Sequence, residues 1–125
     1  MDKTTGGCLC GKVRFEAAGE PLRVGICHCL DCRKHHGAVF YAAAIFDEQA
    51  VTVEGEPHAY QGRHFCPECG SSLFAVTGTE TELHLGALDE PNRFWPDYEV
   101  WTERREHWLP AVEGCKQHQR DKDEA

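Results

Sequence analysis

Seven of the eight cysteines fall into three tight clusters, and their spacing is typical of metal ligands. The clusters read Cys8-x-Cys10, Cys27-x-Cys29-x-x-Cys32 and Cys66-x-x-Cys69. A structural zinc site takes four protein ligands, whereas a catalytic zinc site takes three and leaves a position for water or substrate. Seven thiolates divide into one closed site and one open site. The pattern therefore favours an enzyme with a reactive metal over a purely structural zinc module.

The first and third clusters each offer two ligands. In Cys66-Pro67-Glu68-Cys69-Gly70 a tight turn aims two thiolates at one metal, and the glycine permits close approach of the backbone to the sulfurs. A redox-active Cys-x-x-Cys is the alternative, but it requires a thioredoxin-like setting that the surrounding sequence lacks. Cys8 and Cys10 project from the same face of an extended segment and can reach one ion. Their alternative is a pair of buried free thiols.

The middle cluster offers three thiolates within six residues, Cys27 to Cys32. Water or a substrate thiolate would complete an open site. The alternative is a site closed by a nearby side chain, for which the candidates are His28, Asp31, His35 and His36. The spacing alone leaves open which clusters combine around one ion. Cys115 lies near a polar tail and is expected to be a free thiol without a function.

Charge and composition narrow the remaining classes of function. The net charge is −8 over 125 residues, and a chain this acidic is poorly matched to nucleic acid, whose binding depends on lysine and arginine. No stretch approaches about 18 apolar residues, so we expect no transmembrane helix and no membrane partner. The first residues lack the apolar core of a secretory signal. This favours a cytoplasmic protein with metal-bound cysteines over a disulfide-linked secreted one.

The elements that must position these clusters are mostly strands within a single domain. Apolar patterns predict strands at residues 12–17, 22–27, 38–46, 51–55, 58–61, 72–76, 82–85 and 98–102. The continuous apolar run at 38–46 predicts a strand that is buried on both faces. One helical turn is expected at residues 30–36, directly after the middle cluster. The polar tail, residues 113–125, is expected to be frayed at its end.

The order of these motifs resembles the glutathione-dependent formaldehyde-activating enzyme family, which includes centromere protein V. The likeness covers residues 5–112, and the segments that carry it are Gly6–Phe15, Cys27–Lys34 with Gly37, Arg63–Ser71, Gly86–Pro91 and Trp108-Leu109. The resemblance implies a mainly β, Mss4-like fold of small antiparallel sheets. It also implies a zinc domain at residues 5–112, followed by the tail at 113–125.

The resemblance further implies how the cysteines are used, with two zinc ions per chain. The residues that match the family's structural zinc ligands are Cys8, Cys10, Cys66 and Cys69. Those that match its catalytic zinc ligands are Cys27, Cys29 and Cys32. The implied activity is formation or cleavage of a carbon–sulfur bond in a thiol–aldehyde adduct, as when glutathione adds to formaldehyde. Glutathione or another thiol is the implied co-substrate. A non-catalytic zinc module that binds a macromolecule is the alternative.

Several further side chains are candidates for contact with a substrate. A general acid would protonate the adduct oxygen, and the nearby candidates are His28, Asp31 and His36. The carboxylates of glutathione would need a local basic patch, for which the candidates are Arg23, Arg33, Lys34 and Arg63. An aromatic segment that forms core, lid or substrate wall comprises Phe94, Trp95, Tyr98, Trp101 and Trp108. A solvated or purely structural role is the alternative for each of these residues.

Overall fold

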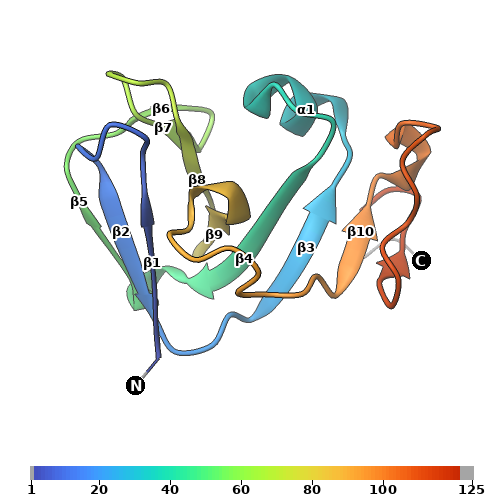
Figure 1. Cartoon of the computed structure of the whole chain (residues 1–125), viewed down its shortest axis with the longest axis horizontal. Helices are drawn as coiled ribbons and strands as arrows, with labels where there is room; N and C mark the ends of the chain where they lie inside the picture. Colours follow the sequence, from blue (N-terminus) through green and yellow to red (C-terminus); the bar gives the residue numbers. More distant parts are fainter. Residues whose placement is uncertain (1, 122–125) are drawn as a thin grey trace.

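The computed structural model describes residues 2–121, which form two β-sheets (Figure 1). The smaller sheet is antiparallel, with the order β1 (Lys3–Gly7), β2 (Arg14–Ala18) and β5 (Val51–Glu54). The larger sheet has eight strands in the order β11-β10-β3-β4-β9-β8-β7-β6. Its strands are β3 (Arg23–Cys27), β4 (Tyr41–Asp47), β6 (His58–Tyr60), β7 (Arg63–Phe65), β8 (Ser72–Thr77), β9 (Glu80–His84), β10 (Tyr98–Val100) and β11 (Lys116–Gln117).

Helical structure is short. The α-helix α1 (Leu30–His36) ends at Gly37, which adopts the left-handed conformation (φ 63°) that glycine tolerates best. The 3₁₀ turns are η1 (Glu48–Ala50), η2 (Leu85–Ala87) and η3 (Thr102–Arg104). Within residues 2–121, no helix has the length and apolar character needed to cross a membrane.

The predicted mainly β class is confirmed, and the helical turn at residues 30–36 is confirmed as α1. The larger sheet is not wholly antiparallel, because β10 runs parallel to both β3 and β11. The chain leaves β9 through η2 and crosses to the far side of β3 before it forms β10 (Figure 1). The expected polar tail contains β11, whereas its expected frayed end, residues 122–125, lies outside the described residues.

The hydrophobic core lies between the two sheets. Phe15 of β2 and Val24 of β3 belong to one buried cluster, together with Ala44 and Phe46 of β4. The apolar run predicted as a doubly buried strand forms β4, at the centre of the larger sheet. Successive side chains of a strand point to opposite faces, so the neighbours of Ala44 and Phe46 leave the core. These neighbours form a second buried cluster, consisting of Tyr41, Ala43 and Ile45.

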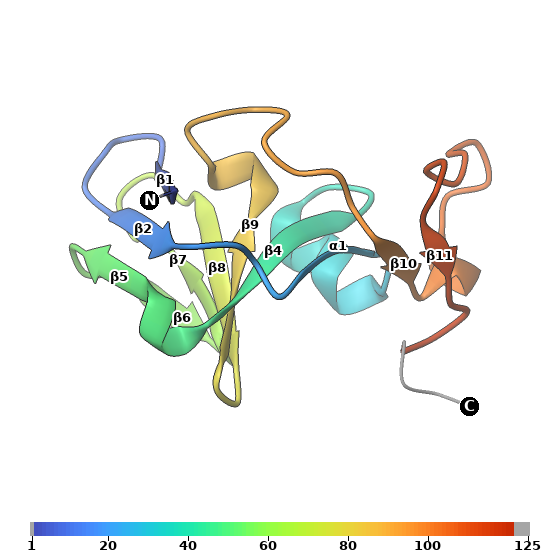
Figure 2. The same ribbon diagram turned by 90° about the horizontal axis from the view of Figure 1, so that it is seen from below.

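The face of the larger sheet that carries this second cluster is called the open face below. Residues directly opposite each other in antiparallel pairs share a face. The register therefore places one row across five strands of the open face, consisting of Arg23, Ile45, Glu82, Ala75 and Arg63. A second row pairs Cys27 with Tyr41. Figure 2 shows α1 and the segment that follows β9 on opposite sides of β4.

Position 25 of β3 requires glycine, because the ring of Tyr98 on the adjacent parallel strand β10 leaves no room for a side chain. A Cβ atom at this position would lie 2.2 Å from Cζ of Tyr98. By contrast, a Cβ atom on Gly86 would have no neighbouring atom within 4 Å.

We expect Gly25→Ala to destabilise the fold by about 1–3 kcal/mol, because the added methyl group forces the Tyr98 ring out of its position. The control Gly86→Ala should change the free energy of unfolding by no more than about 0.5 kcal/mol. Urea titration followed by circular dichroism measures both values. Equal stabilities for the two variants would contradict the close packing of Gly25 against Tyr98.

Candidate metal centres and the adjoining cavity

The first and third cysteine clusters meet in space. The sulfurs of Cys8, Cys10, Cys66 and Cys69 lie within 4.8 Å of one another, although Cys10 and Cys66 are 56 residues apart in sequence. The Cys8 and Cys10 sulfurs are 3.6 Å apart, and those of Cys10 and Cys66 are 3.7 Å apart. One pair comes from the β1–β2 connection of the small sheet and the other from the β7–β8 connection of the large sheet. This four-cysteine group therefore links the two sheets.

Hydrogen-bond donors surround the sulfurs of this group. The backbone N–H of Val13 donates to the Cys8 sulfur at 3.2 Å, and the Ser71 hydroxyl lies 3.2 Å from the Cys69 sulfur. The Ser71 hydroxyl stabilises the thiolate and lowers the pKa of Cys69 to about 5. Gly70 adopts a positive φ of 79°, as expected for the turn after the second cysteine. The geometry matches that of a four-thiolate metal site, which is closed to further protein ligands.

The middle cluster forms a separate group. Cys27 ends β3, Cys29 is the N-cap of α1, and Cys32 lies in the first turn of that helix. Their three sulfurs lie within 4.8 Å of one another. Among residues 2–121, no histidine, aspartate or glutamate ligand atom joins this group. None of the residues suggested as a fourth ligand therefore contributes an atom to this group; these residues are His28, Asp31, His35 and His36.

The electrostatics of the three-cysteine group fit a bound cation. The hydrogen bond with the Cys27 side chain, followed by burial, raises the pKa of Cys32 far above its ordinary value, and burial raises the pKa of Cys29. Thiolates this close repel one another unless a positive charge lies between them. A metal ion would allow all three to ionise, since coordination deprotonates a thiol. Both cysteine groups could thus hold a metal ion.

A buried clamp fixes the loop between Cys27 and Cys29. His28 Nε2 lies 2.7 Å from Oε1 of Glu99, and both side chains are only 1% exposed. The other oxygen of Glu99 accepts from the Val112 backbone N–H at 2.7 Å and from Gln117 Nε2 at 3.0 Å. His28 therefore serves in the support of the loop and is not in position to act as a general acid. Nothing in the local sequence links His28 to Glu99, which is 71 residues away.

Two neighbouring cavities, called lobes below because they share four wall residues, adjoin the three-cysteine group on the open face. The larger lobe, of about 560 Å³, lies against β3 and β10, and Arg23, Tyr98 and Val100 are among its walls. The smaller lobe, of about 220 Å³, lies against α1 and β7. These are called the β10 lobe and the α1 lobe. The residues common to both are Cys32, Tyr41, Thr77 and Glu82.

Tyr41 is the functional candidate that sequence reasoning missed. Its ring packs against Cys27 and Cys32, and its hydroxyl donates a hydrogen bond to Glu82. Burial raises the pKa of Tyr41, so the phenol stays protonated. The signal was present in the alternation of β4, which places Tyr41 opposite Cys27 once the strand register is known.

The predicted general acids are separated by the fold. His36 lines the α1 lobe together with Cys32, but burial lowers the pKa of His36 to about 4. His36 is therefore neutral near pH 7 and is a weak proton donor. Asp31 is exposed in the first turn of α1 and lines neither lobe. The ring of His36 packs against that of Tyr41, with the two centroids 4.9 Å apart.

The four predicted cations have different partners. The Arg23 guanidinium binds both oxygens of Glu80, at 3.2 and 2.7 Å. Arg33 donates to Glu106 and to a backbone carbonyl. Lys34 is exposed and lines neither lobe. Arg63 lines the α1 lobe.

The aromatic segment does not form a single substrate wall. Tyr98 lines the β10 lobe, and Phe94 packs against the core between the sheets. Trp95 and Trp108 are 70% and 68% exposed. Trp101 donates to Asp121. Cys115 lies outside both cysteine groups, and its thiol donates to a backbone carbonyl.

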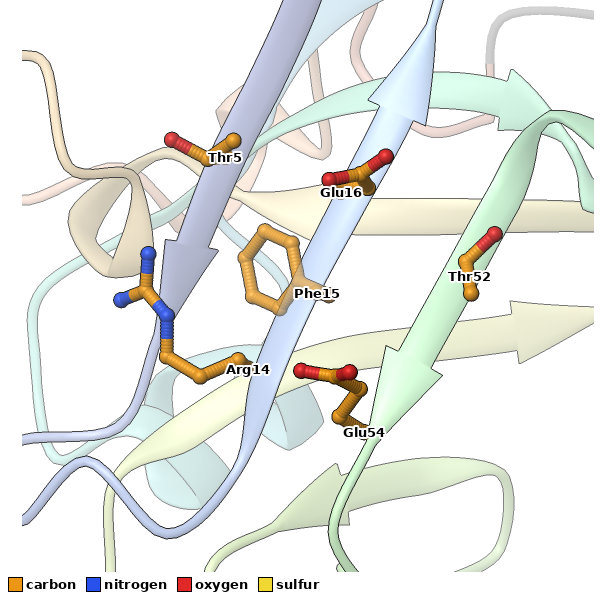
Figure 3. A pocket seen from close by; sticks show the side chains of 6 residues that line it. All are labelled: Thr5, Arg14, Phe15, Glu16, Thr52 and Glu54. Carbon is orange, nitrogen blue, oxygen red and sulfur yellow. The ribbon is translucent and has the colours of Figure 1, made fainter.

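A polar depression of about 280 Å³ lies on the small sheet (Figure 3). Its lining residues are Thr5, Arg14, Phe15, Glu16, Thr52 and Glu54. No cysteine or histidine lines it, and Arg14 is already paired with Asp89. The depression therefore lacks both the thiolate and imidazole ligands that zinc prefers and a free cation, in contrast to the cavity beside the three-cysteine group.

His84 is a buried neutral group in the wall of the α1 lobe. It is 3% exposed, its Nδ1 lies 3.0 Å from the Ser72 hydroxyl, and burial lowers the pKa of His84 to about 3. The unfolded chain binds a proton at this residue below about pH 6.5, whereas the folded chain does not. The stability that His84 contributes is therefore present above that pH and is lost as the pH falls towards 3.

We expect the free energy of unfolding of the wild type to fall more steeply than that of His84→Gln between about pH 6 and pH 4. The difference in slope should approach about 1.4 kcal/mol per pH unit, because glutamine does not titrate. Chemical denaturation at a series of pH values measures it. Both proteins keep the same cysteines, so acid release of metal affects both curves. Parallel curves would contradict a neutral, buried His84.

Comparison with known proteins agrees with this arrangement. The chain matches the family described as glutathione-dependent formaldehyde-activating enzyme over residues 3–104. A protein of Halomonas elongata, named provisionally as such an enzyme, is 35% identical over 92 residues, and the match spans 62% of this chain and 59% of the length of that relative. The crystal structure of a Rhodobacter sphaeroides protein shares the fold, with a TM-score of 0.59 and 24% identity over 71% of this chain and 91% of that one. The chain belongs to the glutathione-dependent formaldehyde-activating enzyme family.

Proposed function

We propose that this protein is a zinc-dependent enzyme that forms or cleaves the carbon–sulfur bond of a thiol–aldehyde adduct, such as the adduct of glutathione and formaldehyde. One observation carries the proposal. The three-cysteine group has no fourth protein ligand among the described residues, and Cys27 and Cys32 form part of the cavity wall. A metal bound there would face a space in which a small molecule fits. The name of the Halomonas elongata relative supports the same reaction.

Cys8, Cys10, Cys66 and Cys69 would hold a structural zinc ion. Cys27, Cys29 and Cys32 would hold a catalytic one. A zinc ion held by these three residues would act as a Lewis acid and would favour the thiolate form of a substrate thiol at neutral pH. In the reaction, the substrate thiol would first release its proton to water. Its sulfur would then form a bond to the carbonyl carbon of the aldehyde, and the π electron pair of the carbonyl would move to its oxygen. That oxygen then takes a proton, and cleavage of the adduct is the reverse of these steps.

Tyr41 would exchange this proton with the substrate oxygen. Its hydroxyl shares a hydrogen bond with Glu82, and both residues line the two lobes beside Cys32. The proton that Tyr41 gives up would be restored from water by way of Glu82. The role was first expected for His28, Asp31 or His36. His28 is buried against Glu99, and His36 is neutral near pH 7. Asp31 is exposed and lines neither lobe.

The alternative, a non-catalytic zinc module that binds a macromolecule, has less support. Such a module requires only closed metal sites and an exposed recognition surface. It gives no reason for a part-buried Tyr41–Glu82 pair beside an incomplete ligand set. An enzyme that handles a small adduct requires both.

We expect the wild type to bind two zinc ions and Cys29→Ser to bind one, because a single serine removes a third of the ligands of the open site. Cys29→Ser should also lose acceleration of adduct formation from glutathione and formaldehyde. Metal content is measured by mass spectrometry, and adduct exchange by ¹³C NMR against the uncatalysed rate. The control Cys115→Ser alters a cysteine outside both groups and should keep both zinc ions and the activity. Full activity with one zinc ion in Cys29→Ser would refute a catalytic zinc.

We expect Tyr41→Phe to slow the exchange by at least about 100-fold, since general acid–base catalysis contributes on the order of 10²–10⁴. Zinc content should be unchanged, because Tyr41 is not a ligand. Tyr60→Phe is the matched control, because Tyr60 is 66% exposed on β6. The same NMR assay compares the two variants. A wild-type rate in Tyr41→Phe would show that this hydroxyl does not carry the proton.

A further inference from the structure

Arg63 is held at a fixed place beside the three-cysteine group. It begins β7, directly after the turn in which Gln61 and Gly62 have positive φ values of 50° and 80°. Gly62 accepts a hydrogen bond from the Val76 backbone N–H at 2.9 Å, which ties the turn to β8. The register places Arg63 on the open face opposite Ala75. Its side chain lines the α1 lobe, as does Cys32.

The guanidinium group of Arg63 has no hydrogen-bonded or ion-paired partner in the described part of the chain, and its charge acts at longer range on the Cys32 thiol. No hydrogen bond or ion pair of its guanidinium group occurs among residues 2–121. Glu82 is the carboxylate in the wall of the α1 lobe, but its two oxygens accept hydrogen bonds from Tyr41 and Thr77. A half-buried guanidinium without a carboxylate partner has unused capacity for a bidentate hydrogen bond.

The other basic groups of the α1 lobe carry no charge near pH 7. Burial lowers the pKa values of His35, His36 and His84, the last two to about 4 and about 3. The Nε2 atoms of His35 and His84 are buried and have no hydrogen-bond partner among the described residues. The wall of the lobe therefore combines one permanent positive charge, that of Arg63, with three neutral histidines and with Glu82, whose oxygens already accept hydrogen bonds.

The β10 lobe lacks such a cation. Its arginine, Arg23, lies at the other end of the same row and is held by both oxygens of Glu80. Asp121 also lines that lobe and adds negative charge. An anionic group on a ligand would therefore enter the α1 lobe, and a neutral part of the ligand would lie in the β10 lobe.

We propose that Arg63 is a specificity-determining residue that binds a carboxylate of the substrate thiol in the α1 lobe, so that the enzyme selects thiols bearing a carboxylate over neutral ones. This inference rests on the proposed function, because it places the thiol sulfur at the three-cysteine site. In this arrangement the anionic end of the ligand lies against α1 and β7. Arg63 acts in binding and takes no part in bond formation.

Two thiols of the same size test the inference: 3-mercaptopropionate and its neutral amide, 3-mercaptopropionamide. Isothermal titration calorimetry of the zinc-loaded protein gives the dissociation constant of each. We expect the wild type to prefer the carboxylate by at least about tenfold, since a hydrogen bond between charged groups contributes this much or more to binding. Arg63→Gln should abolish the preference, and Arg63→Lys should restore part of it, because lysine keeps the charge without the planar fork.

Lys34→Gln is the matched control, because it removes a cation of α1 that lines neither lobe. It should keep the wild-type preference. An undiminished preference in Arg63→Gln would overturn the inference and leave the proposed function intact. Arg63→Gln could also lose part of its zinc while the zinc-loaded molecules keep the preference for the carboxylate. That result would overturn the inference and would make Arg63 a counter-ion of the metal site. If neither thiol bound to the zinc-loaded wild type, the proposed function itself would fail.

Discussion

Repulsion between crowded thiolates is the constraint on which the rest of this structure depends. The cysteine sulfurs form two separate groups, and within each group they lie within 4.8 Å of one another, so that each group can be fully ionised only around a cation. In the four-cysteine group this requirement has a structural consequence, because the ligands come from loops of two different sheets. A metal there would cross-link the sheets and convert its binding free energy into folding free energy. In a chain of 125 residues with a modest core, such a link is a large share of what holds the sheets together.

The larger sheet separates stability from chemistry by its two faces. One face supplies the core with residues such as Phe46 and Val24, and the other carries Tyr41, Glu82 and Arg63 around the cavity. The alternation of β4 produces this division within a single strand. The His28–Glu99 clamp extends the arrangement to the C-terminal segment, because Glu99 binds both the cysteine loop and the backbone of Val112. The three-cysteine site is thereby supported from the core side and left accessible from the open face.

The sequence predicts the metal ligands better than it predicts the substrate site, and the reason is the range of the interactions. Cysteine spacing is local, so the three clusters and the helical turn at residues 30–36 are readable from the chain. The strand at residues 38–46 is also readable, although it begins at Tyr41 because Gly37 ends α1 and the chain bends over the next three residues. Tyr41, by contrast, becomes a candidate only when the register sets it opposite Cys27.

Long-range pairings also redirect residues that local reasoning favoured. His28 is next to two cysteines in sequence, but its ring bonds to Glu99, which lies 71 residues later. The four candidate cations look alike in the sequence. They differ only because the fold supplies Glu80 to Arg23 and Glu106 to Arg33 and gives Arg63 no acidic partner among residues 2–121. Tertiary structure decides which of these cations have an acidic partner, and no local sequence pattern indicates it.

The central claim is that the three-cysteine site holds a metal whose fourth position accepts a thiol sulfur. Anomalous diffraction at the zinc edge, from crystals of the zinc-loaded protein soaked with glutathione, tests it most directly. The account predicts zinc bound by Cys27, Cys29 and Cys32 and by the glutathione sulfur, with zinc–sulfur distances of about 2.3 Å. A fourth ligand from the protein itself, retained in the presence of glutathione, would contradict it.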